Sequence, residues 1–135
     1  VPNRPLFLKL AYFAQDDAVL PLLKKLAGVV DGYSTINTLS ARPVTAKGQP
    51  ALGVDRPIGG VCGDAIRWAG LDMVARLARL RTQLDHQFAI IGVGGVSSVE
   101  HYQAFLATGA DAVMSATGAM WNPQLAFDIK RALKS

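Results

Sequence analysis

Short apolar runs recur along the chain, separated by segments with the spacing of amphipathic helices. Four of these runs predict strands: 6–13, 28–37, 88–93 and 110–117. The second run is the weakest because Gly32 interrupts it. Continuous apolar strands that alternate with helices indicate a parallel sheet covered by helices on both faces. The pattern therefore predicts an α/β protein built from four consecutive βα units.

The longest predicted helix spans 65–84. Its apolar positions recur every three or four residues and form one face: Ile66, Ala69, Met73, Leu77, Leu80 and Leu84. Asp72 and Arg76 lie four residues apart on the opposite face, where they can form an ion pair. We therefore expect this helix to pack its apolar face against the sheet.

A helix is also predicted between the first two strands. Asp16 and Asp17 are expected to cap its start, and Gly28 is expected to end it. Pro21 fits only the first turn of such a helix, because proline lacks the N–H group that an interior position needs.

Two more helices are predicted after the last two strands. Ser97 and Glu100 have the spacing of a capping box, which predicts a helix that ends at Gly109. The final helix is predicted over 123–133. By contrast, the stretch 39–64 is rich in proline and glycine and shows no periodicity, so we expect a long loop that is functional or disordered.

Glycines and polar residues gather where the predicted strands end, which is where ligands bind in parallel sheets. They are Asn37, Thr38, Gly59, Gly60, Gly63, Gly92, Gly94, Gly95, Thr117 and Gly118. Glycine lets backbone N–H groups approach an anion. The two loops after the last two strands match the usual phosphate site of an eight-unit barrel. This match favours half of such a barrel over a small doubly wound sheet, although the unit count fits both.

Lys9 lies inside the apolar first strand. Because a buried ammonium group needs a partner, contact with a ligand is favoured over a lysine that reaches solvent at the strand end. Cys62 is interpreted as a small inert side chain rather than a nucleophile.

A dinucleotide-binding fold is the alternative to the barrel. The sequence GVGGVS lacks the last glycine of the G-x-G-x-x-G pattern, because Ser97 stands there. Asp111 has nearly the required separation but begins the next strand, whereas a ribose contact needs the strand's other end. This fold therefore ranks second.

Composition excludes several classes of function. The net charge of +4 comes from scattered Lys and Arg without a basic run interleaved with aromatics, so no nucleic-acid partner is expected. No apolar run has the roughly 20 residues of a membrane span, so no membrane segment is expected in this chain. A single cysteine rules out an internal disulfide and fits a cytoplasmic location.

Five segments, taken in order, carry a resemblance to a known family: FLKLA around Lys9, INT at 36–38, GGVCG at 59–63, IIGVGGVSS at 90–98 and VMSATG at 113–118. The chain resembles the C-terminal half of a dihydroorotate dehydrogenase and, more broadly, the flavin barrels that include dihydropyrimidine dehydrogenase. Each segment is weak alone, but the ordered set is fairly specific and covers nearly the whole chain. The resemblance implies the C-terminal half of a TIM (β/α)8 barrel, with residues 1–135 forming one half-barrel domain.

The resemblance also implies FMN as the cofactor. Backbone N–H groups of four residues would hold the flavin phosphate: Gly94, Gly95, Ala116 and Thr117. Lys9 would lie by the polar edge of the flavin, and the loop that contains Gly60 and Gly63 would border it. Asn37 and Thr38 would hydrogen-bond a pyrimidine substrate, which the family oxidises from dihydroorotate to orotate.

The family's catalytic base, a Ser or Cys, lies in the first half of the barrel and has no counterpart here. Cys62 differs from it in position, so this chain alone is not expected to complete the reaction. We expect a homo-oligomer or a part of a longer chain. Two rival functions remain: a noncatalytic phosphate- or nucleotide-binding module that closes by self-association, and a phosphate-binding barrel without flavin.

Overall fold

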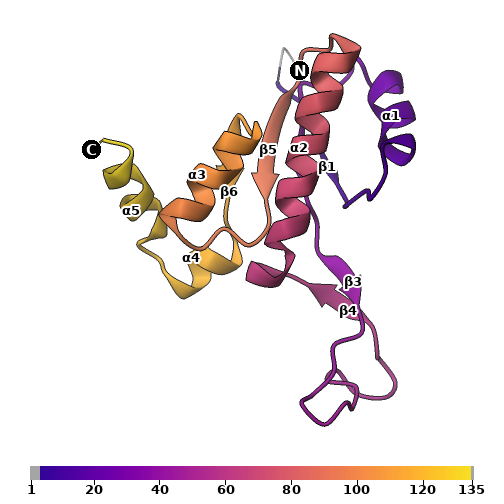
Figure 1. Cartoon of the computed structure of the whole chain (residues 1–135), viewed down its shortest axis with the longest axis vertical. Helices are drawn as coiled ribbons and strands as arrows, with labels where there is room; N and C mark the ends of the chain where they lie inside the picture. The colour runs from indigo at the N-terminus through magenta and orange to yellow at the C-terminus, as the bar shows by residue number, and fades with distance from the viewer. Residues whose placement is uncertain (1–3, 135) are drawn as a thin grey trace.

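A four-stranded parallel sheet forms the centre of the protein, in a computed structural model that describes residues 4–134. The strands follow the spatial order β1 (Phe7–Leu10), β2 (Gly32–Thr35), β5 (Ala89–Val93) and β6 (Ala112–Met114). The helices that follow them are α1 (Asp16–Lys25), α2 (Arg67–Leu84), α3 (Val99–Thr108), α4 (Thr117–Trp121) and α5 (Leu125–Ala132) (Figure 1). The expectation of alternating βα units around a parallel sheet is confirmed.

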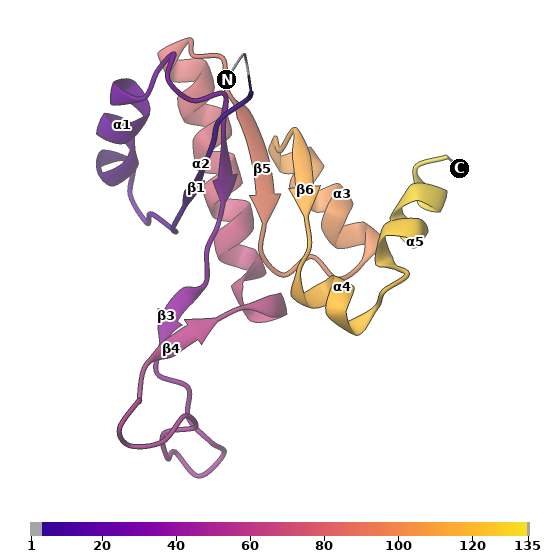
Figure 2. The ribbon, with the colours of Figure 1, turned by 180° about the vertical axis from the view of Figure 1, so that it is seen from behind.

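The helices cover one face of the sheet, and the prediction that both faces are covered is wrong. Seen from behind, the strands lie in front of α2 and α3 (Figure 2). Strand residues that point toward the helices, such as Tyr33 and Ile90, are at most 1% exposed. On the other face Phe7 is 39% and Met114 is 54% exposed. Strands of a doubly wound sheet would be buried on both sides, whereas a segment of a barrel has helices outside only.

The core lies between the sheet and α2. The apolar face predicted for this helix is buried as expected, except that Leu84 is only half-buried: Ile66, Ala69, Met73, Leu77 and Leu80 are each at most 4% exposed. The ion pair between Asp72 and Arg76 is also present, with 3.1 Å between Nη2 and Oδ2. The strict helical period of this segment explains why its position is predictable from sequence alone.

The start of α1 differs from the prediction. Gln15 is the N-cap residue, and the carboxylate of Asp16 makes no capping hydrogen bond. Instead, Asp16 forms ion pairs with Arg76 and Arg79 of α2, and so joins the two helices. Pro21 lies in the interior of α1 rather than in its first turn.

The start of α3 is displaced by one residue from the predicted capping box. Ser98 is the N-cap, and its Oγ accepts a hydrogen bond from the backbone N–H of His101 at 3.2 Å. The end at Gly109 is confirmed, with a φ of 112° that favours glycine. At the C-terminal end of the chain, the predicted strand 110–117 ends at Met114, and the unpredicted helix α4 begins at Thr117.

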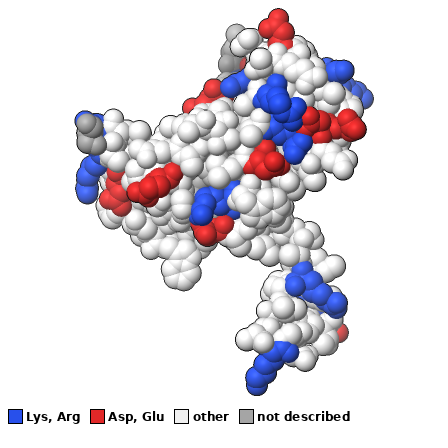
Figure 3. Space-filling view, in the orientation of Figure 1, with Lys and Arg blue, Asp and Glu red and all other residues white. Residues whose placement is uncertain are grey.

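The stretch predicted as a long loop contains two further strands. β3 (Leu39–Ala41) and β4 (Gly59–Val61) pair antiparallel, and the 3₁₀ helix η1 (Gly63–Ile66) leads from β4 into α2. The connection between β3 and β4, residues 42–58, is called the arm here. It projects away from the sheet (Figure 1), and Lys and Arg side chains are visible on it in the space-filling view (Figure 3).

Two carboxylates accept hydrogen bonds at the end of the sheet opposite the predicted site. Asp111 Oδ2 accepts hydrogen bonds from the backbone N–H of Ile90 at 2.7 Å and from Arg81 at 2.6 Å. Asp31 Oδ2 accepts from the N–H of Leu6 at 2.6 Å.

None of the helices formed by residues 4–134 is long and apolar enough to cross a membrane.

Candidate functional site

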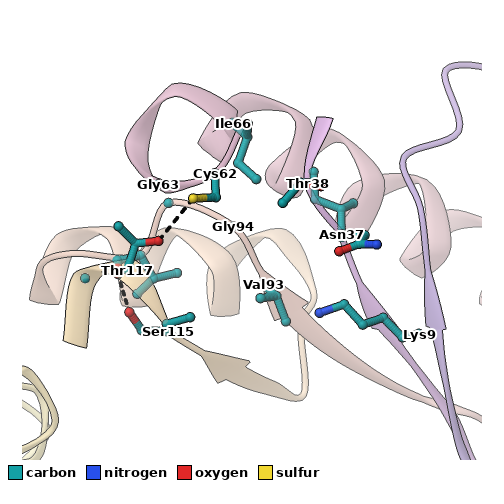
Figure 4. A pocket seen from close by; sticks show the side chains of 15 residues that line it. Lys9, Asn37, Thr38, Cys62, Gly63, Ile66, Val93, Gly94, Ser115 and Thr117 are labelled. Atoms are coloured by element: carbon teal, nitrogen blue, oxygen red, sulfur yellow. Dashed lines mark hydrogen bonds between the residues drawn. The ribbon is translucent and has the colours of Figure 1, made fainter. Parts of the chain in front are cut away.

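A pocket of about 120 Å³ lies at the carboxyl ends of the sheet strands. Its walls come from four places: the end of β2, the turn after β5, the turn after β6, and the start of η1. Lys9 of β1 forms one side, and Figure 4 shows its side chain reaching toward Val93. Parallel strands bring their carboxyl ends to one edge, which is why segments distant in sequence meet here.

Backbone hydrogen bonds position Asn37 and Thr38 at the end of β2. The N–H of Asn37 donates to the carbonyl of Leu10 at 3.1 Å, and the N–H of Ile36 donates to the carbonyl of Val93 at 2.9 Å. The chain is thereby held between the ends of β1 and β5, with the Thr35–Ile36 peptide bond in the cis form. Asn37 and Thr38 are both exposed, so their side chains are available to a ligand.

The turn after β5, residues 94–97, is called the glycine turn here. Gly94 has a φ of 130° and Gly95 a φ of 69°, both in the region that favours glycine. A Cβ atom on Gly95 would also lie only 2.7 Å from Cβ of Arg67 and 2.8 Å from the carbonyl oxygen of Gly63. The backbone of the glycine turn therefore packs directly against η1 and the start of α2.

The end of β6 packs equally closely against the glycine turn. Ser115 Oγ donates a hydrogen bond to the carbonyl of Val96 at 2.6 Å. A Cβ on Gly118 would lie 2.1 Å from the same carbonyl oxygen, so only glycine permits this approach. Thr117 lies between these residues, and its Oγ1 donates to Sγ of Cys62 at 3.6 Å (Figure 4).

Lys9 lies on the uncovered face of the sheet. In the strand register it stands beside Ser34, which stands beside Ile91. Its side chain is exposed, so the premise of a buried ammonium group is wrong for this chain. Lys9 forms no ion pair with a carboxylate among residues 4–134, which leaves its charge free to act on a ligand.

The pocket combines one cation with backbone amides and no carboxylate. Lys9 is the only charged residue among those that line it, in the part of the chain that the structure describes. The hydroxyl groups of Thr38 and Thr117, the amide of Asn37 and the thiol of Cys62 add neutral polar groups. No cluster of three or more metal-ligating side chains occurs in residues 4–134. Such a lining suits an anion with a polar organic part.

The structure brings most of the sequence-predicted site residues into this one pocket: Lys9, Asn37, Thr38, Gly63, Gly94, Gly95, Ala116 and Thr117. Gly60 does not line it. A Cβ on Gly60 would lie 2.5 Å from Oγ1 of Thr38, so Gly60 allows β4 to pack behind Thr38.

Sequence reasoning missed other lining residues, including Ser115, Val96 and Ile66. Ser115 carried a usable signal, because it is a polar residue at the end of an apolar strand. Val96 and Ile66 carried none, since their apolar side chains resemble any other core residue.

Comparison with known proteins identifies the family to which this chain is similar. A profile of the family described as "Dihydroorotate dehydrogenase" matches residues 2–135. The chain is 39% identical to the dihydroorotate dehydrogenase of Dictyostelium discoideum, over 93% of the chain and 34% of that protein. It is 34% identical to the catalytic subunit of dihydroorotate dehydrogenase B (NAD(+)) of Alkaliphilus metalliredigens, over 96% of the chain and 40% of that protein. It is 32% identical to the corresponding subunit of Oceanobacillus iheyensis, over 94% of the chain and 40% of that protein.

The chain thus spans between a third and two fifths of the length of these relatives. The match extends across nearly every residue that this chain has. It includes all the strands and turns that build the pocket. The chain belongs to the dihydroorotate dehydrogenase family.

Proposed function

We propose that this chain is the FMN-binding, C-terminal half of a dihydroorotate dehydrogenase-like barrel. The observation that carries the proposal is the pocket itself, in which Lys9 and two glycine-bearing turns converge without a carboxylate. The single-sided sheet supports the half-barrel, because its bare face corresponds to the inside of a barrel. A complete barrel that contains this half would act as a flavin oxidoreductase of pyrimidine biosynthesis and oxidise dihydroorotate to orotate.

The residues present fit the phosphate end of FMN. Gly94 and Gly95 occupy backbone conformations that side chains rarely adopt, and they line the pocket together with Ala116 and Thr117. These four residues would hold the phosphate through their backbone N–H groups, as anions are commonly held at such turns. The pocket is below the roughly 300–1,000 Å³ typical of cofactor sites, so the flavin ring itself would extend beyond it.

The ring would then lie over the bare face of the sheet, beside Lys9. Bound FMN supplies an acceptor for hydride from the substrate. Lys9 would place positive charge at the polar edge of the flavin, where it stabilises negative charge. Asn37 and Thr38 would orient the pyrimidine by hydrogen bonds. The general base belongs to the half of the barrel that this chain does not contain.

Titration of the 135-residue chain with FMN, followed by flavin fluorescence, tests the proposal. We expect saturable binding that Lys9→Ala weakens by about tenfold, or 1.4 kcal/mol. Lys24→Ala is the matched control, because Lys24 is an exposed lysine on α1, away from the pocket. Absence of saturable binding, or equal weakening by both substitutions, would contradict the proposal.

The size of the pocket favours one other candidate, a noncatalytic module that binds phosphate esters. Riboflavin and ribose 5-phosphate separate the two functions. The flavin site predicts that FMN binds more tightly than either compound, because riboflavin lacks the phosphate and ribose 5-phosphate lacks the isoalloxazine ring. The module predicts that ribose 5-phosphate binds as tightly as FMN.

A further inference from the structure

The imidazole of His101 contacts the glycine turn from outside the pocket and connects this turn to the start of α2. Its Nδ1 atom is 3.4 Å from the backbone nitrogen of Ser97 and 3.2 Å from Oγ of the same residue. Nη1 of Arg67 lies 3.2 Å from the same Nδ1. One ring nitrogen therefore contacts both the glycine turn and the first residue of α2.

These contacts determine the protonation state of the ring. The backbone N–H of Ser97 and the guanidinium of Arg67 can only donate hydrogen bonds. Nδ1 must therefore be an acceptor, which requires a neutral imidazole with its proton on Nε2. His101 is the third residue of α3, and its side chain reaches back past the N-cap Ser98 to the backbone N–H of Ser97.

The same Nη1 atom of Arg67 also forms an ion pair with Oδ1 of Asp64, a residue of η1. Asp64, Arg67, His101 and Ser97 thus form a continuous chain of polar contacts from η1 to the glycine turn. The two segments that it joins are the ones that Gly95 packs together. They supply the pocket with Gly63 on one side and Gly95 on the other.

We infer that His101 is a positioning residue for the anion site: in its neutral form it holds the glycine turn against η1, with the backbone amides facing the pocket. The identity of the anion as the FMN phosphate rests on the proposed function. The connection between His101, Ser97 and Arg67 stands on the geometry alone.

Protonation of His101 would place an N–H at Nδ1, opposite two groups that can only donate. Burial lowers the pKa of His101 from its ordinary value of 6.5, and the charge of Arg67 lowers it further. Glu100 and the backbone of Gly95 oppose this shift, while Asp64 faces Arg67 rather than the ring. The hydrogen bonds that Nδ1 accepts from Ser97 N–H and Arg67 are therefore present at neutral pH and are lost as the pH falls through the pKa of His101, although Oγ of Ser97 can accept from the protonated ring.

The direction of the pH effect separates this role from a simple charge effect. A positive charge added near an anion site tightens binding by itself, whereas loss of the aligned turn weakens it. Our inference predicts weaker FMN binding at low pH. The phosphate of FMN also takes up a proton near pH 6, which affects every variant equally.

Two substitutions isolate the acceptor. In His101→Asn the amide oxygen is attached to Cγ, as Nδ1 is, so it can accept the same hydrogen bonds but does not titrate. His101→Leu removes the acceptor. At about pH 8 we expect His101→Asn to bind FMN within about threefold of the wild type, and His101→Leu to bind about tenfold more weakly. Between about pH 8 and pH 5.5 the wild type should weaken more than His101→Asn, by less than about tenfold because the pKa of His101 is lowered from 6.5.

Spectroscopy of the ring gives a readout that needs no FMN. Long-range ¹H–¹⁵N correlation spectra of the free wild-type chain should show an unprotonated Nδ1 at neutral pH. Amide exchange at residues 94–97 should be slower in the wild type than in His101→Leu, and unchanged in His101→Asn. A protonated Nδ1, or equal exchange in all three proteins, would overturn the inference.

The two readouts distinguish the two proposals. A neutral acceptor and a protected turn without any FMN binding would leave the positioning role standing and contradict the proposed function. FMN binding with the same pH dependence in the wild type and His101→Asn would support the proposed function and contradict the role of His101. If His101→Leu fails to fold by far-UV circular dichroism, the comparison of the wild type with His101→Asn still decides.

Discussion

The ring of Phe105 lies directly against the backbone of Gly92, the first glycine of the IIGVGG sequence. A Cβ atom on Gly92 would lie 2.4 Å from Cδ1 of Phe105. A Cβ on Gly70 of α2 would lie 2.8 Å from Cζ of the same ring. Phe105 is completely buried. Gly92 therefore serves the packing of α3 on the sheet, whereas Gly94 and Gly95 shape the pocket.

Gly92→Ala should destabilise the protein by forcing the Phe105 ring away from β5. Overpacking of this kind costs about 1–3 kcal/mol, measurable by urea unfolding. The double variant Gly92→Ala with Phe105→Leu tests the cause, because the smaller side chain vacates the space. We expect the two substitutions to couple by about 0.5–3 kcal/mol. Strictly additive effects would exclude the contact as the reason for the glycine.

Asp16→Asn should weaken the contact between α1 and α2. Hydrogen bonds from Arg79 and Arg76 lower the pKa of Asp16 from 3.8 to about 2. A carboxylate with a lowered pKa contributes stability above its unfolded value, and the contribution disappears as the pH falls through its folded value. We therefore expect Asp16→Asn to have a lower Tm than the wild type at pH 6, with the difference vanishing toward about pH 2.

Asp17→Asn is the matched control for this measurement. Asp17 lies in the same turn of α1 but makes no ion pair with the other residues that the structure describes. Its substitution should leave the Tm and its pH dependence nearly unchanged. Equal effects of both substitutions would point to the charge of the helix terminus rather than to the link with α2.

Removal of the arm should leave the rest of the fold intact. The arm pairs with itself through Val44 and Pro50, and Ala41 and Gly59 stand opposite each other where it begins and ends. Replacing residues 42–58 by Asn-Gly would close β3 and β4 as a two-residue hairpin. We expect the Tm to change by less than about 3 °C and FMN binding to stay within about twofold. A large loss of either would show that the arm supports the site.

The uncovered face and the exposed edge strands β1 and β6 should cause self-association of the isolated chain. Sedimentation velocity over a range of concentrations measures it. Met114→Glu places a charge on the bare face at an edge strand and should reduce the association. Met120→Glu is the control, because Met120 is 82% exposed on α4, outside the sheet. If the chain sediments as a monomer at every concentration, the prediction is contradicted.

Periodic segments were predictable from sequence, and choices between neighbouring polar residues were not. The helix over 65–84 has a repeated apolar face, so its position and its buried side both follow from the pattern. Ser97 and Ser98 are chemically equivalent as caps, and their roles are decided by the contact of His101 with Ser97. Asp16 was assigned to capping because its ion-pair partners lie some 60 residues away in sequence.

The site was predictable to the extent that glycine and polar residues mark strand ends. Lys9, Asn37 and Thr117 meet in one pocket, as the ends of parallel strands require. The bare face of the sheet was not predictable, because an apolar strand has the same sequence pattern whether or not a helix covers its second side. The two short strands β3 and β4 gave no signal, since glycine disrupts the alternation of β4.

All four sheet strands run in the same direction, and this restricts which surface can extend the sheet. A two-fold axis that sets β1 beside the β1 of another copy, or β6 beside β6, makes the neighbouring strands antiparallel. Parallel hydrogen bonding continues only where β6 of one unit meets a strand placed as β1 is in the next. Two such seams would join two of these units into a closed ring with twice the number of strands. The direction of the strands alone therefore requires that edge β6 pairs with edge β1, whatever side chains lie on those edges.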